Sequence, residues 1–288
     1  MGKLRDKMKQ DMELKHLSER TIDTYLKCVE NFVKHYGKSP EDMGHDGIRD
    51  YLYYLLKEKE SSQASISQHY SALKLFYQTT LGRDWEALKI PRSKREKKLP
   101  VVLSKKEIWA IFEEVHNLKH LAILMTIYSG GLRLSEAINL KVSDIDSQRM
   151  MIRVNQGKGH KDRYTLLGER TLDVLRIYYK DTKPKEWLFP STTPDKPIGA
   201  SSIQKAFNVA LIKANIKKKA SVHTLRHSFA THLLEDGTDI PYIQNLLGHS
   251  DSRTTSIYLH VARKKLSKVV SPIDNIEEDP GKPKKPKK

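Results

Sequence analysis

The sequence contains one cysteine and no long apolar run. The single cysteine, Cys28, excludes an internal disulfide and a zinc site built from cysteine ligands, and it suits a reducing compartment. No window approaches the run of about 18 apolar residues that a membrane span needs. The charged N-terminus, MGKLRDKMKQDMELK, has no apolar stretch for a signal peptide. We therefore expect a cytoplasmic protein without a membrane partner.

Acidic residues are scarce relative to basic ones. The 288 residues include 35 Asp and Glu against 52 Lys and Arg, which gives a formal net charge of +17. Hydrophobic residues make up only 38%, but they fall in periodic runs, so most of the chain should fold into one large or two modest domains. The charge points to a polyanionic partner, although a well-solvated cationic surface has the same composition.

Helical periodicity dominates the first 88 residues. Apolar side chains recur at helical spacing over four segments, residues 3–17, 20–36, 45–59 and 63–80. The stripe of the second segment runs from Ile22 to Val33, and Gly37 follows as a C-cap. No strand pattern interrupts these segments, so we predict an all-helical domain over residues 1–88.

Residues 89–100, KIPRSKREKKLP, differ sharply from the helices before them. They hold six cations against the single acid Glu96, with prolines near both ends, and such a segment should form an extended linker. A solvated linker explains it when taken alone. Cations on an extended chain can also follow a phosphate backbone and release counterions. Between two domains of a basic protein we favour DNA contact, through Lys89, Arg92, Lys94, Arg95, Lys97 and Lys98.

The second domain, residues 101–274, should be mainly helical with a small β-sheet. Ser104 and Glu107 have the spacing of a capping box that opens a helix. A further helix over about 118–129 ends at the glycine pair 130–131.

A β-hairpin is expected in the middle of this domain. Residues 149–154 and 163–167 have strand patterns and flank the glycine-rich loop NQGKGHKD. From Glu169 onward the pattern is helical again. The last residues, 275–288, are low-complexity and cationic, and we expect a disordered tail there.

The run from His223 to Tyr258 contains histidine, arginine and tyrosine residues whose spacing suggests a functional site. In a helix predicted over about 222–236 and ended by Gly237, Val222, Leu225, Phe229 and Leu233 would form the buried stripe. His223 and Arg226 are three residues apart and would project from one face. Such a pair could equally be exposed or bonded to local carbonyls.

The next segment is predicted to display a second histidine in a turn. Asp239 can cap a short helix with Pro241 in its first turn, and Gly248 supplies a left-handed stop just before His249. Tyr258 follows nine residues later in another helical stretch. Most tyrosines are packing residues, but Tyr258 stands out by its distance from His249 and its cationic neighbourhood.

His223, His227 and His232 are spaced closely enough in the sequence to suggest a metal site. Only the first two have i, i+4 geometry, no acidic residue follows His223, and Arg226 would set a cation beside the ion. We expect neither a metal nor a cofactor.

Two upstream motifs add cations. GGLRLSE puts Arg133 after a Gly-Gly turn at the start of a helix, and Glu136, three residues on, can hold its guanidinium. GKGHKDR puts Lys158 at a hairpin tip between two glycines, where a flexible amine could reach a ligand. Either motif alone is weak, but six converging positions are specific.

Together these residues resemble the tyrosine recombinases of the phage-integrase family, most closely the small Xer and integron-integrase type. The matching segments are GLRLSE, GKGHKDR, HTLRHSFATHLL, LLGHSDSRTTSIYLH and SPID at 271–274. The resemblance covers nearly the whole chain. It implies a helical SAM-like core-binding domain and a mixed, mainly α catalytic domain that clamp DNA between them. It carries over a catalytic set, Arg133, Lys158, His223, Arg226, His249 and Tyr258, with Glu136 in support.

Two departures concern the subclass. The chain begins directly with the core-binding domain, so we expect no separate arm-site-binding domain of the lambda-integrase kind. The interval between Trp187 and His223 leaves no room for the extra helix typical of integron integrases, which weakens that assignment.

The chemistry explains why these residue types are needed. Arg133 and Arg226 can bind the non-bridging oxygens of a phosphodiester transition state. The Tyr258 hydroxyl is a weak nucleophile at neutral pH, so nearby cations and His223 as proton acceptor would activate it. Lys158 is the natural donor of a proton to the departing 5′ oxygen.

His249 can donate a hydrogen bond to the same phosphate. The products of attack by Tyr258 would be a 3′-phosphotyrosine and a 5′ hydroxyl, and strand exchange would pass through a Holliday junction. The resemblance implies double-stranded DNA with inverted-repeat core sites as partner, and four protomers in the synapse. The apolar side of the segment after Tyr258 would dock into a neighbour or pack within its own domain; it comprises Val261, Leu266, Val269 and Val270.

Two other activities fit part of this pattern. A type IB topoisomerase would use the same residues to nick and reseal one duplex. A catalytically silent DNA-binding regulator would keep the fold, although the intact six-residue set argues against it. Chromosome dimer resolution and mobile-element integration or excision would both use the recombinase chemistry.

Overall fold

The computed structural model describes residues 2–85, 99–155, 162–193 and 195–248. The chain separates into two compact units, residues 1–97 and 98–288. This division falls inside the segment predicted to be a linker. The linker cations at positions 89–98 lie outside the described residues, as do the predicted tail and the segment after Tyr258.

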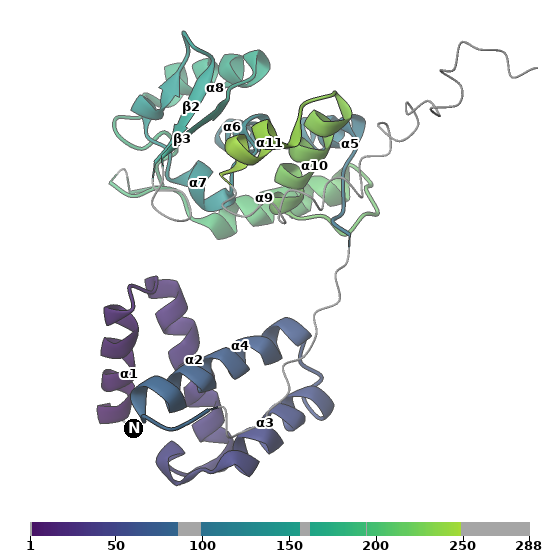
Figure 1. Ribbon diagram of the computed structural model, residues 1–288. Coiled ribbons are helices and arrows are strands. Elements are labelled where there is room, and N and C mark those ends of the chain that lie inside the picture. The colour runs from purple at the N-terminus through teal and green to yellow at the C-terminus, as the bar shows by residue number, and fades with distance from the viewer. Residues whose placement is uncertain (1, 86–98, 156–161, 194, 249–288) are drawn as a thin grey trace, which may run out of the picture. The chain divides into compact units, whose positions relative to one another are not determined.

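The described part of the first unit is a bundle of helices, as predicted (Figure 1). Its elements are α1 (Gly2–Leu14), α2 (Glu19–Tyr36), the short η1 (Pro40–Asp42), α3 (His45–Lys57), α4 (Gln63–Leu75) and a π-helical extension of α4, η2 (Phe76–Thr80). The first helix ends before its predicted end at residue 17, because His16 takes a left-handed conformation with φ 51°.

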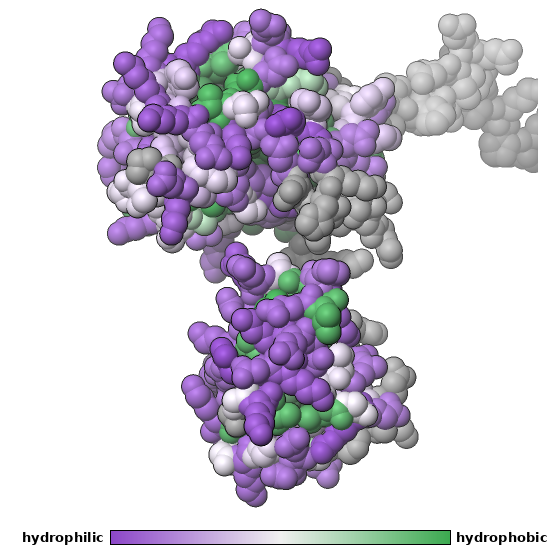
Figure 2. Space-filling model, turned by 90° about the vertical axis from the view of Figure 1, so that its left-hand side faces the viewer, coloured by the Kyte–Doolittle hydropathy of each residue, from purple (hydrophilic) through white to green (hydrophobic). Residues whose placement is uncertain are grey.

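Helix α2 shows how these elements are specified. Ser18 caps its start by accepting a hydrogen bond from the backbone N–H of Thr21. Gly37 ends it in the left-handed conformation and donates its N–H to the carbonyl of Val33, as predicted. The buried stripe, which includes Cys28 and Phe32, faces the core, and Figure 2 shows a mostly hydrophilic outer surface. Local periodicity and caps therefore account for this helix.

The second unit surrounds helix α6, which is buried along most of its length. Its helices are α5 (Lys105–Glu113), α6 (Leu118–Gly130), α7 (Leu134–Ile138), η4 (Val142–Asp144), α8 (Glu169–Thr182), α9 (Ala200–Lys213), α10 (Val222–Glu235) and α11 (Ile240–Leu247). The predicted capping box of Ser104 and Glu107 is present at the start of α5. No helix in the described parts of the chain is long and apolar enough to cross a membrane.

The sheet of this unit has three antiparallel strands in the order β1-β2-β3. The predicted hairpin is confirmed as β2 (Met151–Val154) and β3 (Arg163–Leu166), and Val154 and Arg163 are the pair nearest to the connecting loop. Strand β1 (Ile145–Asp146) was not predicted, because two residues are too few to show an alternating pattern. The hairpin therefore sits at the edge of a small sheet rather than alone.

Helix α10 differs from its prediction. The expected apolar stripe is buried at Val222, Leu225 and Phe229, but Leu233 is only partly buried. Five polar side chains are buried as well, namely Thr224, Arg226, Ser228, Thr231 and His232. Three of the four residues of the predicted stripe are therefore buried as predicted, and the polar residues are buried in addition because α10 packs against α6, α9 and α11 at once.

Candidate active site

The site begins where α6 ends. Gly131 takes a left-handed conformation (φ 60°), and a Cβ at this position would lie 2.3 Å from the ring of Phe229. Only glycine fits both the dihedral and the space. The chain then turns sharply so that Arg133 is the N-cap of α7, at the helix mouth predicted for it.

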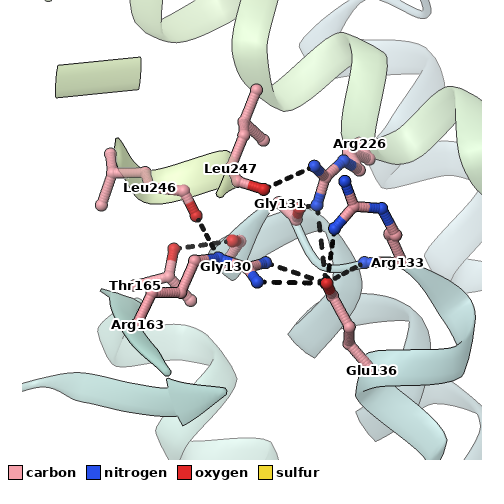
Figure 3. A network of polar contacts seen from close by, with 9 residues as sticks. All are labelled: Gly130, Gly131, Arg133, Glu136, Arg163, Thr165, Arg226, Leu246 and Leu247. Carbon is pink, nitrogen blue, oxygen red and sulfur yellow. Dashed lines mark hydrogen bonds and ion pairs between the residues drawn. The ribbon is translucent and has the colours of Figure 1, made fainter. Parts of the chain in front are cut away.

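Glu136 is the centre of the site (Figure 3). Its carboxylate accepts a hydrogen bond of 2.6 Å from Nη1 of Arg133 and one of 2.7 Å from the backbone N–H of the same residue. The side chain of Glu136 is 7% exposed, whereas that of Arg133 is 25% exposed. The predicted support of Arg133 by Glu136 is therefore present, and Arg133 still offers surface to a ligand.

Arg226 reaches the same carboxylate from α10. Its Nη1 lies 3.5 Å from Glu136 and donates to the carbonyl of Gly131 at 2.6 Å, and its Nη2 donates to the carbonyl of Leu247 at 2.7 Å. The side chain is 1% exposed. A buried charge of this kind needs such partners. Arg226 therefore ties α10 to the end of α6 and the end of α11, which the sequence pattern alone did not indicate.

Arg163 is a third arginine at this carboxylate. It donates from Nη1 and Nη2 to the two carboxylate oxygens of Glu136, at 3.1 and 2.8 Å, and from Nε to the carbonyl of Leu246 at 2.9 Å. Arg163 is the last residue of the GKGHKDR motif, and no role was predicted for it. The sequence offered one signal, a cation at the first position of a predicted strand. In the structure this side chain pairs with the buried Glu136 and is only 10% exposed.

The arginines fix the charge state of Glu136. Burial by itself would raise the pKa of this carboxyl, but hydrogen bonds from Arg163 and Arg133, together with the charge of Arg163, outweigh burial and lower the pKa to about 2. Three guanidinium groups thus surround one carboxylate. The excess positive charge suits the binding of a phosphate.

His223 stands beside this cluster at the exposed start of α10. Burial lowers its pKa, and the charges of Arg226 and Arg133 lower it further, against an opposing effect of Glu136. The ring of His227 packs edge-on against His223 at 4.6 Å between centroids, and burial lowers the pKa of His227 to about 4. The lowered pKa favours the neutral form of His223, which is the form that can accept a proton.

His223 and His227 pack against each other, but His232, the third histidine of the group, is bonded elsewhere. Nδ1 of His232 bonds the hydroxyl of Tyr128 at 2.8 Å. Across the described ranges, no group of three or more His, Cys, Asp or Glu side chains could hold a metal ion.

Helix α11 ends at the site. Its bounds match the prediction, with Pro241 in the first turn and Gly248 in the left-handed conformation at its end. The side chain of Asp239, however, makes no capping hydrogen bond, so that part of the prediction was wrong. A Cβ at Gly248 would lie 2.9 Å from Cδ of Arg163, so glycine is required here for space as well as for its φ of 62°.

The described residues thus bring together Arg133, Glu136, His223 and Arg226, and they add Arg163. The other three predicted catalytic residues, Lys158, His249 and Tyr258, lie outside the described residues. The strands that flank the Lys158 segment, and α11 with Gly248 just before His249, are among the described residues.

Comparison with known proteins is consistent along the chain. Residues 101–265, more than half of the sequence, match the phage integrase family, and residues 4–87 match the N-terminal SAM-like domain of phage integrases. The integrase/recombinase y4qK of Sinorhizobium fredii is 43% identical over 275 residues, which cover 95% of this chain and 89% of the relative. The tyrosine recombinase XerD of Staphylococcus aureus is 31% identical over 276 residues, covering 88% of this chain and 92% of the relative.

Solved structures give the same answer for the fold. The XerA recombinase is 32% identical with a TM-score of 0.54, covering 92% of this chain and 96% of the other. A lambda integrase tetramer bound to a Holliday junction is only 17% identical, yet its fold matches with a TM-score of 0.69 over 89% of this chain and 76% of the other. The chain belongs to the phage integrase family and is a tyrosine recombinase.

Proposed function

We propose that this protein cleaves and rejoins double-stranded DNA at specific sites through Tyr258. The observation that carries this proposal is the cluster in which Glu136 pairs with Arg133 and Arg226, with His223 close enough for their charges to lower its pKa. Such a cluster combines an anion-binding charge with a proton acceptor, and a tyrosine nucleophile needs both.

The proposed reaction is a transesterification at one phosphodiester. The phenolic oxygen of Tyr258 forms a bond to phosphorus while the bond from phosphorus to the 5′ oxygen breaks. The phenolic proton passes to His223, and Lys158 gives a proton to the 5′ oxygen. The products are a 3′-phosphotyrosine and a free 5′ hydroxyl. Because the ester bond is retained, a 5′ hydroxyl from a partner duplex reverses the step without ATP.

The two arginines of the set are placed differently. Arg133 keeps a quarter of its side chain exposed and is the guanidinium that faces a ligand most directly. Arg226 is buried and holds two backbone carbonyls, so its positive charge acts on the phosphate from behind. His249 follows the end of α11, whose Leu247 carbonyl Arg226 binds, and it adds a hydrogen bond to the phosphate.

The proposed partner is double-stranded DNA with inverted-repeat core sites. The linker cations would follow its backbone, and a homotetramer would assemble on two synapsed sites and exchange strands through a Holliday junction. The lambda integrase tetramer on such a junction supports this assembly. The apolar residues after Tyr258 are the proposed contact between neighbours. Chromosome dimer resolution and mobile-element integration or excision are the processes that fit this activity.

A trapped covalent complex tests the nucleophile. Footprinting of the DNA that flanks the gene identifies the bound site, and a duplex nicked beside the scissile phosphate then prevents religation. Wild-type protein should accumulate a DNA adduct, and Tyr258→Phe should form none while binding the site with near wild-type affinity. An undiminished adduct with Tyr258→Phe would overturn the assignment of the nucleophile.

The same substrate separates the alternatives. A silent DNA-binding regulator would bind without forming an adduct. A type IB topoisomerase would relax supercoiled plasmids whether or not they carry the footprinted site, whereas the proposed recombinase requires it. Lys158→Ala should slow cleavage of an ordinary 5′ oxygen by about 100-fold or more, and a 5′-bridging sulfur, which leaves without a proton, far less.

A further inference from the structure

Arg163 joins the strand after the hairpin loop to two other parts of the site. It starts strand β3, it binds both carboxylate oxygens of Glu136 on α7, and it binds the carbonyl of Leu246 in the last turn of α11. We propose that Arg163 is a positioning residue for the acid: it fixes strand β3, which follows the Lys158 segment in the chain, against the arginine cluster. This inference rests on the proposed role of Lys158 as the acid.

The hairpin is fastened to the site mainly through β3. Arg163 pairs with Val154 at the loop end of the ladder and follows Lys158 by five residues in the chain. Two residues further along the same face, the Thr165 hydroxyl donates to the carbonyl of Gly130 at 2.7 Å (Figure 3). Thr165 therefore anchors the inner part of the strand, and Arg163 anchors the end nearest to Lys158.

The other strand is fastened elsewhere. Asn155, the last described residue before the loop, donates to the buried carboxylate of Asp144 at 2.7 Å. Asp144 belongs to η4 and also pairs with Arg153, which lies on β2 two residues before Asn155. These bonds join the end of β2 to η4, whereas the bonds of Arg163 join β3 to Glu136 on α7 and to α11.

The contacts of Arg163 need a planar fork. Three nitrogens of one guanidinium serve three oxygens on two different helices, with distances of 2.8 to 3.1 Å. A lysine ammonium carries the same charge but cannot span these acceptors in one geometry. Gly248 leaves the space through which the side chain passes, since a Cβ there would crowd Cδ, Nε and Nη1 of Arg163. The site is built around this side chain.

A change of leaving group tests the proposal. Single-turnover cleavage of the nicked duplex is measured with a 5′-bridging oxygen and with a 5′-bridging sulfur, for wild type and Arg163→Lys. We expect Arg163→Lys to slow the oxygen substrate by about 100-fold, as for loss of a general acid, and the sulfur substrate by less than about fivefold. A role in folding alone would slow both equally, and equal losses, or no loss, would overturn the proposal.

Two further variants complete the experiment. Arg153→Lys is the matched control on the same hairpin: its ion pair with Asp144 does not involve Glu136, its side chain is 44% exposed, and both rates should stay near wild type. Gly248→Ala displaces Arg163 while keeping its charge. Because it also strains the turn before His249, it should slow both substrates, but the oxygen substrate more than the sulfur substrate, which keeps the test open if Arg163→Lys fails to fold. If wild type forms no adduct on either substrate, the proposed function itself fails.

Discussion

Helices α2 and α10 are similar in length but differ in what surrounds them. Helix α2 buries one stripe and turns its charged side chains to solvent, with a strong periodic contrast between its faces. Helix α10 is buried on nearly all sides, and its buried set includes an arginine, a histidine and three hydroxyl side chains. In α2 the polar residues give solubility. In α10 they hold other elements in place.

The two helices differ in what their buried residues stabilise. Burying Arg226 costs free energy that its hydrogen bonds must offset, and each of those bonds joins α10 to a separate element. The structural role of α2 ends at its own core. The role of α10 extends to Gly131, Glu136 and Leu247, which come from three other segments.

The largest expected effect comes from two matched glycines. Gly37 ends α2 and Gly131 ends α6 beside α10, both in the left-handed conformation. A Cβ at Gly37 meets nothing within 4 Å, whereas one at Gly131 would meet Phe229 at 2.3 Å. Gly131→Ala should lower the free energy of unfolding by about 4 kcal/mol, from strain plus overpacking, and Gly37→Ala by about 1 kcal/mol, from strain alone.

Urea denaturation followed by circular dichroism measures both changes. Equal losses for the two variants would mean that Phe229 and its neighbours on α10 can move to accommodate the added methyl group at little cost. The contrast between the two helices would then lie in polarity and not in packing.

The next effect concerns acid. The pKa of Glu136 is about 2 in the folded protein against 4.5 for an unperturbed carboxyl, so its stabilisation is present above pH 4.5 and is lost as the pH falls toward 2. The loss amounts to about 3 kcal/mol at most. His227, with a pKa lowered from 6.5 to about 4, also disfavours the folded state as the pH falls below 6.5.

Tryptophan fluorescence can follow this effect in the catalytic unit. Replacing the buried Trp85 of the first unit by Phe leaves Trp109 and Trp187 as reporters. Free energies of unfolding from pH 7 to pH 3 should fall less steeply in Glu136→Gln than in the parent. Parallel profiles would show that Glu136 is not the group responsible.

The smallest effect compares two helix starts. Ser18 bonds the first turn of α2, whereas the side chain of Asp239 makes no such bond at the start of α11, which packs on α10. Ser18→Ala should cost about 1 kcal/mol and Asp239→Ala about 0.3 kcal/mol, from the helix dipole alone. Thermal unfolding of the two variants ranks them, and a larger loss at Asp239 would reverse the comparison.

Much of the fold could be predicted because its signals are local. The periodic stripe of α2, its stop at Gly37 and the box of Ser104 and Glu107 depend on residues within one or two turns of each other. The same holds for the hairpin and for the turn at Gly130–Gly131. The two-residue strand β1 could not be predicted, because so short a strand shows no alternating pattern.

The site was predictable only in part. The pairing of Arg133 with Glu136 spans three residues and follows from helix geometry. The burial of Arg226 depends on Gly131, 95 positions away, and the place of Arg163 depends on Glu136 and Leu246, 27 and 83 positions away. Motif spacing identifies such residues without showing which of them face a ligand and which hold the others.

The solitary Cys28 gives the first unit a reporter of its own. Its thiol is buried in the core of that unit, and burial raises its pKa to about 11, so a thiol-reactive dye finds little thiolate and no path to it in the folded state. Labelling occurs when the unit opens. Its rate, read alongside tryptophan fluorescence from the catalytic unit, would show in one sample whether the two halves of this recombinase unfold together or one at a time.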